Sequence, residues 1–437
     1  MHSWIEQLNA PERPKRLEAL QGLYQLYCEG KVQKMPVDDE YVNNHIHTTY
    51  SFSPYSPAKA LWMAFISGLS TAGIMDHDSV GGALEFIEGG QILQMPVTVG
   101  MECRVDMSAT RLAGKRINNP DQNGIAYIAV HGIPHHRLER VSEFIRPYQE
   151  HRNRRNREMV QNLNQITEQY GMGISFERNV QPISMCHDGG SITERHILYA
   201  LALRMLDVLG QGEKLVRFLK EELRIHLNAR LESYLSDTAN PYYAYDLLGV
   251  LKSDLVEKFY IPASDECPAV SDVIALCEEI GAISAYAYLG DVVDSVTGDK
   301  KAQKFEDEYL DLLFEEIKAI GFHAVTYMPS RNTKAQLERV KMLCDKHGLF
   351  QISGEDINSP RQKFLCEAMK DESFRNLIDS AWALIGHELA ASENPDMAMF
   401  SKASDKKFLA LQDRIRYYKD IGKRNRGGIQ CETHSGI

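Results

Sequence analysis

Two short motifs near the start of the chain carry side chains that can bind a metal ion. His45 and His47 are separated by one apolar residue, so in an extended strand both imidazoles point to the same face. About thirty residues later, a predicted buried strand over 71–75 ends in Asp76-His77-Asp78. Strand ends that present His and Asp just before a helix are where barrel and open-sheet enzymes place their active sites. For the His-X-His motif alone, a pair of unrelated surface histidines is the competing interpretation.

Two further predicted strands end in the same kinds of side chain. The strand over 96–102 ends at Glu102, and the strand over 124–130 is followed by His131. Because the C-terminal ends of barrel strands converge on one pocket, four such endings favour a shared site over four unrelated polar residues. Imidazole and carboxylate are ligands for Zn, Mn or Fe, and no paired cysteines lie nearby. The pattern therefore favours a catalytic metal site over a closed structural one.

Composition and charge narrow the class of protein. The 437 residues are 43% hydrophobic and 25% charged, which is ordinary globular usage and enough for roughly two or three units of about 150 residues. The net charge of −11 argues against a general nucleic-acid-binding surface. The basic run over 151–157 is either a solvated helix face or a group that reaches an anionic substrate. Scattered cysteines, a polar N-terminus and the lack of an apolar run of about 18 residues predict a cytoplasmic protein.

The elements that position the motifs follow from the hydrophobic pattern. Leucines at helical spacing predict a helical N-terminal arm over 1–37. Strands and helices alternate in two parts of the chain, over 38–196 and 280–370, which predicts an α/β unit. Helical periodicity predicts an all-helical insertion over 197–279 and a helical C-terminal extension over 371–437. The insertion is either a lid that selects the substrate or a brace that does not contact it.

The ordered set of motifs resembles the PHP (polymerase and histidinol phosphatase) family of metal-dependent phosphoesterases, over roughly residues 40–200 and 280–370. The segments that carry the resemblance are His45-Ile46-His47-Thr48, Met75-Asp76-His77-Asp78, Gly100-Met101-Glu102, His131-Gly132, Ile192-Thr193-Glu194-Arg195-His196-Ile197, Gly321-Phe322-His323-Ala324-Val325 and the stretch over 348–358. The resemblance implies an α/β fold, a distorted (β/α)7 PHP barrel with a large all-helical insertion and helical N- and C-terminal extensions. It also implies up to three metal ions at the C-terminal mouth of the barrel.

Carried over residue by residue, the resemblance implies a set of metal ligands. Those of the first ion are His45, His47, Glu102 and Asp356. Glu102 and His131 begin the site of a second ion. His77 belongs to a third, and Asn358 stands where the family has the final His of its closing motif.

Catalytic roles are implied in the same way for three side chains. Arg195 and His196 stand where the family has a helix that faces the site. An arginine at this place makes a two-pronged hydrogen bond to a phosphate, and a histidine donates a proton to the leaving group. His77 is the third catalytic candidate.

The chain departs from the family pattern at three ligand positions. Phe52 stands where the third ion takes an Asp, Tyr288 where the second ion takes a His, and Asn358 where the closing motif has a His. A phenyl ring cannot ligate, a neutral phenol is a poor ligand, and an amide oxygen suits a hard cation better than a zinc-like ion. The centre is therefore expected to be mononuclear or loosely dinuclear. His187 either replaces a missing ligand or is an exposed loop histidine.

The predicted function is that of a metal-dependent hydrolase, a phosphoesterase that acts on a small phosphorylated metabolite or nucleotide through a metal-activated water. We expect one to two divalent ions per chain, at most three, from among Mn, Zn, Fe and Mg. The expected partner is the small phosphorylated substrate, with no nucleic-acid polymer and no membrane, and the oligomeric state stays open. Two alternatives remain: a PHP-like protein with a depleted metal centre that binds a ligand or regulates without turnover, and a metal hydrolase of another bond type.

Overall fold

The computed structural model describes residues 2–39, 41–292 and 303–424. Its centre is one seven-stranded sheet in which the strand order follows the chain, from β1 to β7. Neighbouring strands are parallel except β4, which is antiparallel to both β3 and β5. The strands are β1 (Val42–Ile46), β2 (Thr71–His77), β3 (Val97–Asp106), β4 (Ile125–His131), β5 (Ile283–Ala287), β6 (Ala324–Tyr327) and β7 (Phe350–Ser353).

The sheet curves into a barrel because the segment after β7 returns to β1. The backbone N–H of His47 donates to the carbonyl of Ile357 at 3.0 Å, and the N–H of Ile357 donates to the carbonyl of His45 at 3.2 Å. The side-chain amide of Asn44 also donates to the carbonyl of Ser353 at 2.8 Å. These contacts close the ring between the first and last strands, and the predicted α/β barrel is confirmed.

Two strands differ from the sequence expectation of four equivalent strand ends. β3 continues to Asp106, so Glu102 lies within the strand and not at its end. β4 runs in the opposite direction, and His131 pairs with Gly100, two positions before Glu102 on β3. Residues 107–124 connect β3 to β4 through turns without a helix. A parallel connection needs a crossover of a dozen or more residues, usually a helix, whereas turns suffice for an antiparallel pair.

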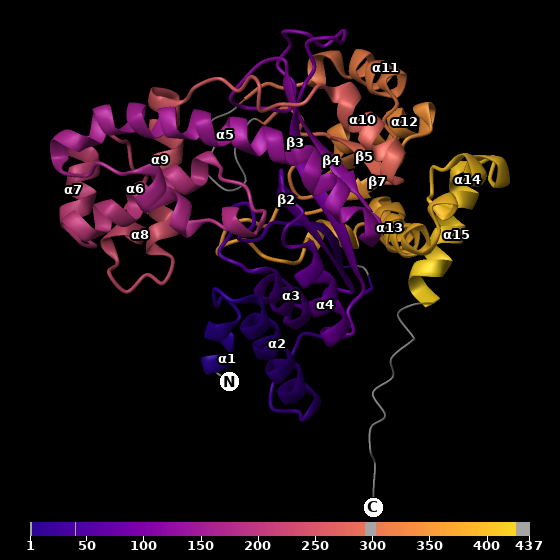
Figure 1. The fold of residues 1–437 in the computed structure, drawn as a ribbon, viewed down its shortest axis with the longest axis horizontal. Helices are drawn as coiled ribbons and strands as arrows, with labels where there is room; N and C mark the ends of the chain where they lie inside the picture. Colours follow the sequence, from indigo (N-terminus) through magenta and orange to yellow (C-terminus); the bar gives the residue numbers. More distant parts are fainter. Residues whose placement is uncertain (1, 40, 293–302, 425–437) are drawn as a thin grey trace, which may run out of the picture.

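Helices cover the barrel and also form a separate group to one side of it, over α5 to α9 (Figure 1). None of the described helices is both long and apolar enough to cross a bilayer. The helices are α1 (His2–Gln7), α2 (Arg13–Cys28), α3 (Pro57–Ile66), α4 (Ala83–Leu93), α5 (Leu138–Thr167), α6 (Glu194–Leu209), α7 (Glu213–Glu221), α8 (Ala229–Ser236), α9 (Tyr243–Phe259), α10 (Val270–Ile280), α11 (Leu310–Ile320), α12 (Lys334–His347), α13 (Arg375–Glu393), α14 (Lys402–Lys407) and α15 (Leu411–Arg424).

The lateral helices, α5 to α9, share a hydrophobic core of their own. Buried side chains from Met159 in α5 to Phe259 at the end of α9 form one cluster, and α10 contributes to the larger cluster around the barrel. Arg361, which follows β7, makes a two-pronged ion pair with Asp246 of α9 at 2.7 Å and lies 3.8 Å from the ring centroid of Tyr234. The lateral helices are therefore tied to the segment that closes the barrel. The domain boundaries expected from the sequence stay a prediction.

The N-terminal and C-terminal helices pack on different parts of the barrel: α1 and α2 lie beside α3 and α4, whereas α13 to α15 lie on another side (Figure 1). Buried Arg16 of α2 pairs with buried Glu85 of α4, which fixes the N-terminal helices to the barrel. Glu388 of α13 accepts from the Thr98 hydroxyl at 2.6 Å and from the Val99 N–H at 2.7 Å, at the start of β3. Helix α13 thus covers the N-terminal ends of the parallel strands. Residues 425–437 of the predicted C-terminal extension lie outside the described residues.

Candidate metal centre

Two imidazoles and two carboxylates meet inside the barrel, and we call His45, His47, Glu102 and Asp356 the metal centre. The Nε2 atoms of His45 and His47 are 3.2 Å apart, and each lies within 3.9 Å of Glu102 Oε2. Asp356 Oδ1 is 3.2 Å from His47 Nε2. The closing contact at Ile357 delivers Asp356 to this place, since its neighbour is hydrogen-bonded to β1. The structure thus brings together the four side chains expected to hold the first ion.

A hydroxyl and a carboxylate fix the tautomer of His47. The Ser51 hydroxyl donates its one proton to Asp76 Oδ1 at 2.6 Å, so it accepts from His47 Nδ1–H at 3.3 Å. Asp76 also accepts from the N–H of Thr48 at 2.7 Å and so holds this loop in place. The Nε2 of His47 therefore carries its lone pair toward the metal centre. This is the arrangement that metal-ligating histidines adopt.

The carboxylates of the metal centre are held in their charged form. Burial opposes ionisation of Glu102, but the imidazoles of His77 and His45 lower its pKa well below the usual range. Burial likewise opposes ionisation of Asp356, and the cationic groups near it, His45 and Arg195 among them, hold its pKa well below the usual range. Both carboxylates are therefore ready to bind a cation near neutral pH.

The imidazoles of His47 and His131 are held in their neutral form. Burial and the repulsion from His77 lower the pKa of His47. Burial lowers the pKa of His131 to about 3, and His45 and Glu102 are near enough for their charges to act on it. The buried Nε2 atom of His131 has no hydrogen-bond partner among the described residues. A neutral imidazole with an unused nitrogen is the form that binds a metal.

The donor set fits a divalent ion. In the tautomer that Ser51 imposes, the lone pair of His47 faces a carboxylate oxygen of Asp356 at 3.2 Å, a repulsive arrangement that a cation between them makes favourable. His45, His47 and Glu102 offer ligand atoms that all lie within 4.8 Å of one another. The nitrogen and oxygen donors suit Zn, Mn or Fe.

Two of the three departures from the family pattern are engaged in other contacts. The Phe52 ring meets the rings of His196 and Tyr199 edge-on, at centroid distances of 5.0 and 5.6 Å, and belongs to the core of the lateral helices. The Tyr288 hydroxyl donates to Asp307 Oδ1 at 2.6 Å. Neither position offers a ligand, which is consistent with fewer than three ions.

Asn358, the third departure, joins the metal centre to helix α6. Its amide nitrogen donates to Asp356 Oδ1 at 2.6 Å, and its amide oxygen accepts from Arg195 Nη1 at 2.8 Å. Both ends of the amide are therefore occupied. In this arrangement Asn358 positions Asp356, and a role as a direct ligand would require the Arg195 bond to break.

Removing this amide is expected to weaken metal binding. We predict that Asn358→Ala lowers the affinity for Mn²⁺ or Zn²⁺ by roughly 10- to 100-fold, because Asp356 loses the group that orients it. Competition with a chromophoric chelator measures the affinity. Ser359→Ala, which removes a neighbouring hydroxyl, is the matched control, and equal affinities in the two variants would contradict the positioning role.

The remaining predicted residues fall in different surroundings. His77 Nδ1 lies 2.9 Å from Glu102 Oε2 and its ring stands 4.5 Å from the ring of His47. His196 is buried, its Nδ1 accepts from the N–H of Thr193 at 3.0 Å, and burial lowers its pKa to about 3. His196 therefore caps α6, which gives its proposed role as a proton donor no support. His187 is exposed.

A cavity of about 180 Å³ opens onto the metal centre. Side chains of the barrel line one part of it, and side chains of α6 and α9 line another. The residues contributed by the two helices are Glu194, Arg195, Leu198, Lys252 and Val256. The lateral helices thus form part of the wall of the cavity beside the metal centre.

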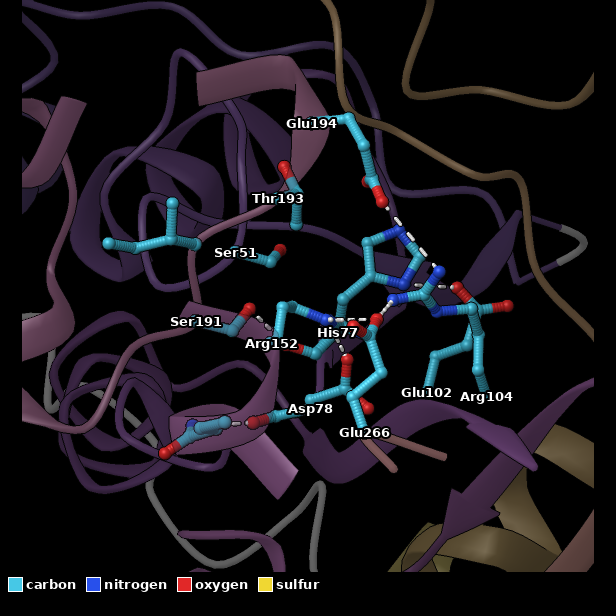
Figure 2. A network of polar contacts seen from close by, with 12 residues as sticks. Ser51, His77, Asp78, Glu102, Arg104, Arg152, Ser191, Thr193, Glu194 and Glu266 are labelled. Atoms are coloured by element: carbon cyan, nitrogen blue, oxygen red, sulfur yellow. Dashed lines mark hydrogen bonds and ion pairs between the residues drawn. The ribbon is translucent and has the colours of Figure 1, made fainter. Parts of the chain in front are cut away.

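A buried ionic network borders the same cavity (Figure 2). Arg104 of β3 pairs with Glu266, and its Nη1 lies 3.7 Å from Glu194. Arg152 of α5 pairs with Asp78 and lies 3.3 Å from Glu266. The network ties the segment after β2, strand β3, and helices α5 and α6 together.

Arg155 completes the network, so the basic run is only partly a solvated face: Arg154 and Arg157 are exposed, whereas Arg152 and Arg155 meet carboxylates. Arg155 reaches Glu194 at 2.6 Å and Glu266 at 2.5 Å, and both Arg155 and Arg152 are buried. Arg152 and Arg155 share a helix face with buried Met159 and Leu163, at spacings of three and four residues. In the sequence, this continuous stripe of positions was the pattern that could have indicated that Arg152 and Arg155 are buried. The positive charge of the run indicated the opposite.

No family model matches the chain, and no curated protein matches it in sequence. Among solved structures, a candidate metal-dependent phosphoesterase from Bifidobacterium adolescentis aligns with 78% of this chain and 95% of its own, with a TM-score of 0.51 and 20% identity. An amidohydrolase from Chromobacterium violaceum, with bound sulfate and no metal, aligns with 74% of this chain and 88% of its own, with a TM-score of 0.46 and 17% identity. At this identity the first likeness shows the fold alone, which is a TIM-like barrel.

Proposed function

We propose that the protein is a metal-dependent hydrolase of the PHP type that cleaves a phosphoester of a small molecule. The observation that carries the proposal is the metal centre: two imidazoles and two ionised carboxylates face one another at the edge of a small cavity. The shared fold with the protein from Bifidobacterium adolescentis, which is described as a candidate phosphoesterase, supports it.

Five residues of this chain would hold the metal ions that hydrolysis requires. His45, His47, Glu102 and Asp356 would hold the ion, and the orphan nitrogen of His131 would add to a second position. A divalent ion supplies an acidic water near neutral pH and a counter-charge for the phosphate oxygens.

Two further side chains can act on the substrate directly. Arg195 lines the cavity and offers guanidinium N–H groups to a phosphate while its Nη1 stays on Asn358. His77 holds Glu102 through Nδ1, which leaves Nε2 to give a proton to the leaving oxygen. In the reaction the ester P–O bond breaks, the water oxygen bonds to phosphorus, and the leaving alcohol takes a proton.

A second candidate function is ligand binding without turnover. The observation that favours it is that Phe52 and Tyr288 are committed to other contacts, so that the second and third ions lose ligands. The metal centre would then retain one ion with too few neighbours to hydrolyse a phosphoester.

Metal content and phosphate release separate these functions. We expect one to two equivalents of Mn, Zn or Fe per chain in protein purified without chelator, and release of phosphate from a panel of small phosphomonoesters. Removal of the metal should stop release, and adding Mn²⁺ should restore it. Bound metal with hydrolysis of only carboxyl esters or amides would move the assignment to another bond type. Bound metal without hydrolysis of any substrate would favour the binding function.

A further inference from the structure

The segment that carries Asp356 folds back on itself over residues 356–362, which we call the ligand loop. The backbone N–H of Gln362 donates to the carbonyl of Ser359 at 3.2 Å, and Pro360 takes the second position of this turn, which suits its fixed φ. The Gln362 side chain thereby reaches the start of the loop. Its Nε2 donates to the carbonyl of Asp356 at 2.6 Å. Its Oε1 accepts from the backbone N–H groups of Asn358 at 2.8 Å and Ser359 at 2.7 Å.

The backbone at Asp356 is consequently held from two sides. On one side Ile357 exchanges backbone hydrogen bonds with His45 and His47, at the junction with β1. On the other side the Gln362 side chain holds the carbonyl of Asp356. A functional side chain must be kept within roughly 0.5 Å of its productive place. Gln362 is placed to do this for the Asp356 carboxylate, through the backbone that carries it.

Arg361 anchors the ligand loop in the lateral helices. Its guanidinium donates twice to the carboxylate of Asp246 on α9, each time at 2.7 Å, and once to Asn240 Oδ1 at 3.2 Å. The rings of Tyr234 and Tyr242 lie 3.8 and 5.2 Å from it, measured to their centroids. The Asp246 side chain is only 8% exposed. A two-pronged pair with a buried carboxylate is a stronger anchor than an ion pair on the surface.

The lateral helices hold the ligand loop at a second point. Arg195 of α6 donates to the amide oxygen of Asn358, whose amide nitrogen donates to the Asp356 carboxylate. Helices α6 and α9 pack in the hydrophobic core that the lateral helices share. The loop is therefore fastened near its start and near its end to the same group of helices.

We propose that the lateral helices position the metal ligand Asp356, with Asp246 anchoring Arg361 and Gln362 passing this constraint to the Asp356 backbone. Asp246 and Gln362 are positioning residues that offer no atom to the ion. The inference rests on the metal ion that the proposed function assigns to the metal centre, and it needs no particular substrate. The all-helical insertion then contributes to metal binding from outside the barrel.

The affinity of the full-length protein for Zn²⁺, measured by competition with a chromophoric chelator, tests the proposal. Gln362→Leu keeps the size of the side chain and removes its three hydrogen bonds. We expect this variant to bind Zn²⁺ roughly 10- to 100-fold more weakly, as when other groups that orient metal ligands are removed. Asp246→Asn acts one step further away and should weaken binding by about 10-fold, at the lower end of that range.

Two substitutions of the same kinds serve as matched controls. Gln122 also exchanges two side-chain hydrogen bonds with the backbone, at Ala263, at 2.8 and 2.7 Å. Glu232 makes an ion pair with Lys220 at 2.6 Å, between α8 and α7. Gln122→Leu and Glu232→Gln should both keep the Zn²⁺ affinity of the unaltered protein. Circular dichroism establishes that each compared variant is folded.

The Asp356→Ala background separates positioning from a general loss of structure. Once the carboxylate is gone, Gln362→Leu and Asp246→Asn should change the Zn²⁺ affinity by no more than roughly twofold, because the group that they position is absent. Bound Co²⁺ gives a second measurement, since its visible absorption depends on its ligands and their geometry. The spectrum of Gln362→Leu should shift toward that of Asp356→Ala.

The outcomes distinguish this inference from the proposed function. An unchanged Zn²⁺ affinity in Gln362→Leu or in Asp246→Asn would overturn the positioning by the lateral helices. So would a loss of affinity that is equally large in the Asp356→Ala background. Failure of the unaltered protein to bind Zn²⁺ or Co²⁺ would overturn both the inference and the proposed function. Binding that depends on Gln362 and Asp246, without phosphate release from any ester, keeps the inference and removes the phosphoesterase.

Discussion

Replacement of His47 by alanine is expected to remove the tightly bound metal and to lower phosphate release by roughly 10³-fold, which corresponds to about 4 kcal/mol of lost transition-state stabilisation. The Nε2 of His47 is the atom that lies between His45 and Asp356, 3.2 Å from each partner atom. Without the imidazole of His47, the carboxylates of Glu102 and Asp356 keep only the imidazole of His45 between them. Metal content per chain and kcat/KM for phosphate release are the two measurements.

An exposed histidine provides the control for this substitution. His136 lies on the surface after β4, and His136→Ala should change neither metal content nor rate. If His47→Ala retained metal and activity, the metal centre would not be the active site. If it lost metal but kept activity, the hydrolysis would not depend on the ion.

Replacement of Glu266 by glutamine is expected to destabilise the protein by about 3–5 kcal/mol, the usual cost of leaving buried charges without their partner. Glu266 is 3% exposed and contacts Arg104, Arg152 and Arg155. The substitution removes one of three carboxylates that compensate three guanidinium groups. Equilibrium denaturation followed by circular dichroism measures the change.

The neighbouring Asp265 serves as the comparison because its side chain is 79% exposed. Asp265→Asn should alter stability by no more than about 0.5 kcal/mol, as most surface substitutions do. If Glu266→Gln were as mild as Asp265→Asn, the network would not contribute to folding as its burial implies.

From the sequence, the residues of the candidate metal centre could be predicted more completely than the elements around them. His45 lies in β1 and His47 directly follows it, and Glu102 lies in the recognisable buried strand β3, so local patterns were enough to find them. Asp356 was found through the order of the motifs. The direction of β4 was not found, because it depends on how the connecting segment folds and not on the strand residues themselves.

The buried ionic network could not be read from local patterns. Its partners lie far apart in the chain, such as Asp78 with Arg152 and Arg152 with Glu266. A run of arginines looks the same in sequence whether water or carboxylates surround it. Only the helix face shared with Met159 and Leu163 distinguishes buried arginines from solvated ones. It is informative only if charged residues are allowed as members of a buried face.

The seam between the first and last strands has a consequence for how the protein holds together. Asn44 and Ser353, which meet there, are 309 residues apart in sequence, so closing the seam costs more chain entropy than a local contact does. His47 stands on one side of it and Asp356 on the other. An ion bound by both side chains would link the two sides of the seam. Occupancy of the site would therefore raise the unfolding temperature of the whole barrel. Loss of the metal would then loosen the barrel at the junction between β1 and the segment after β7.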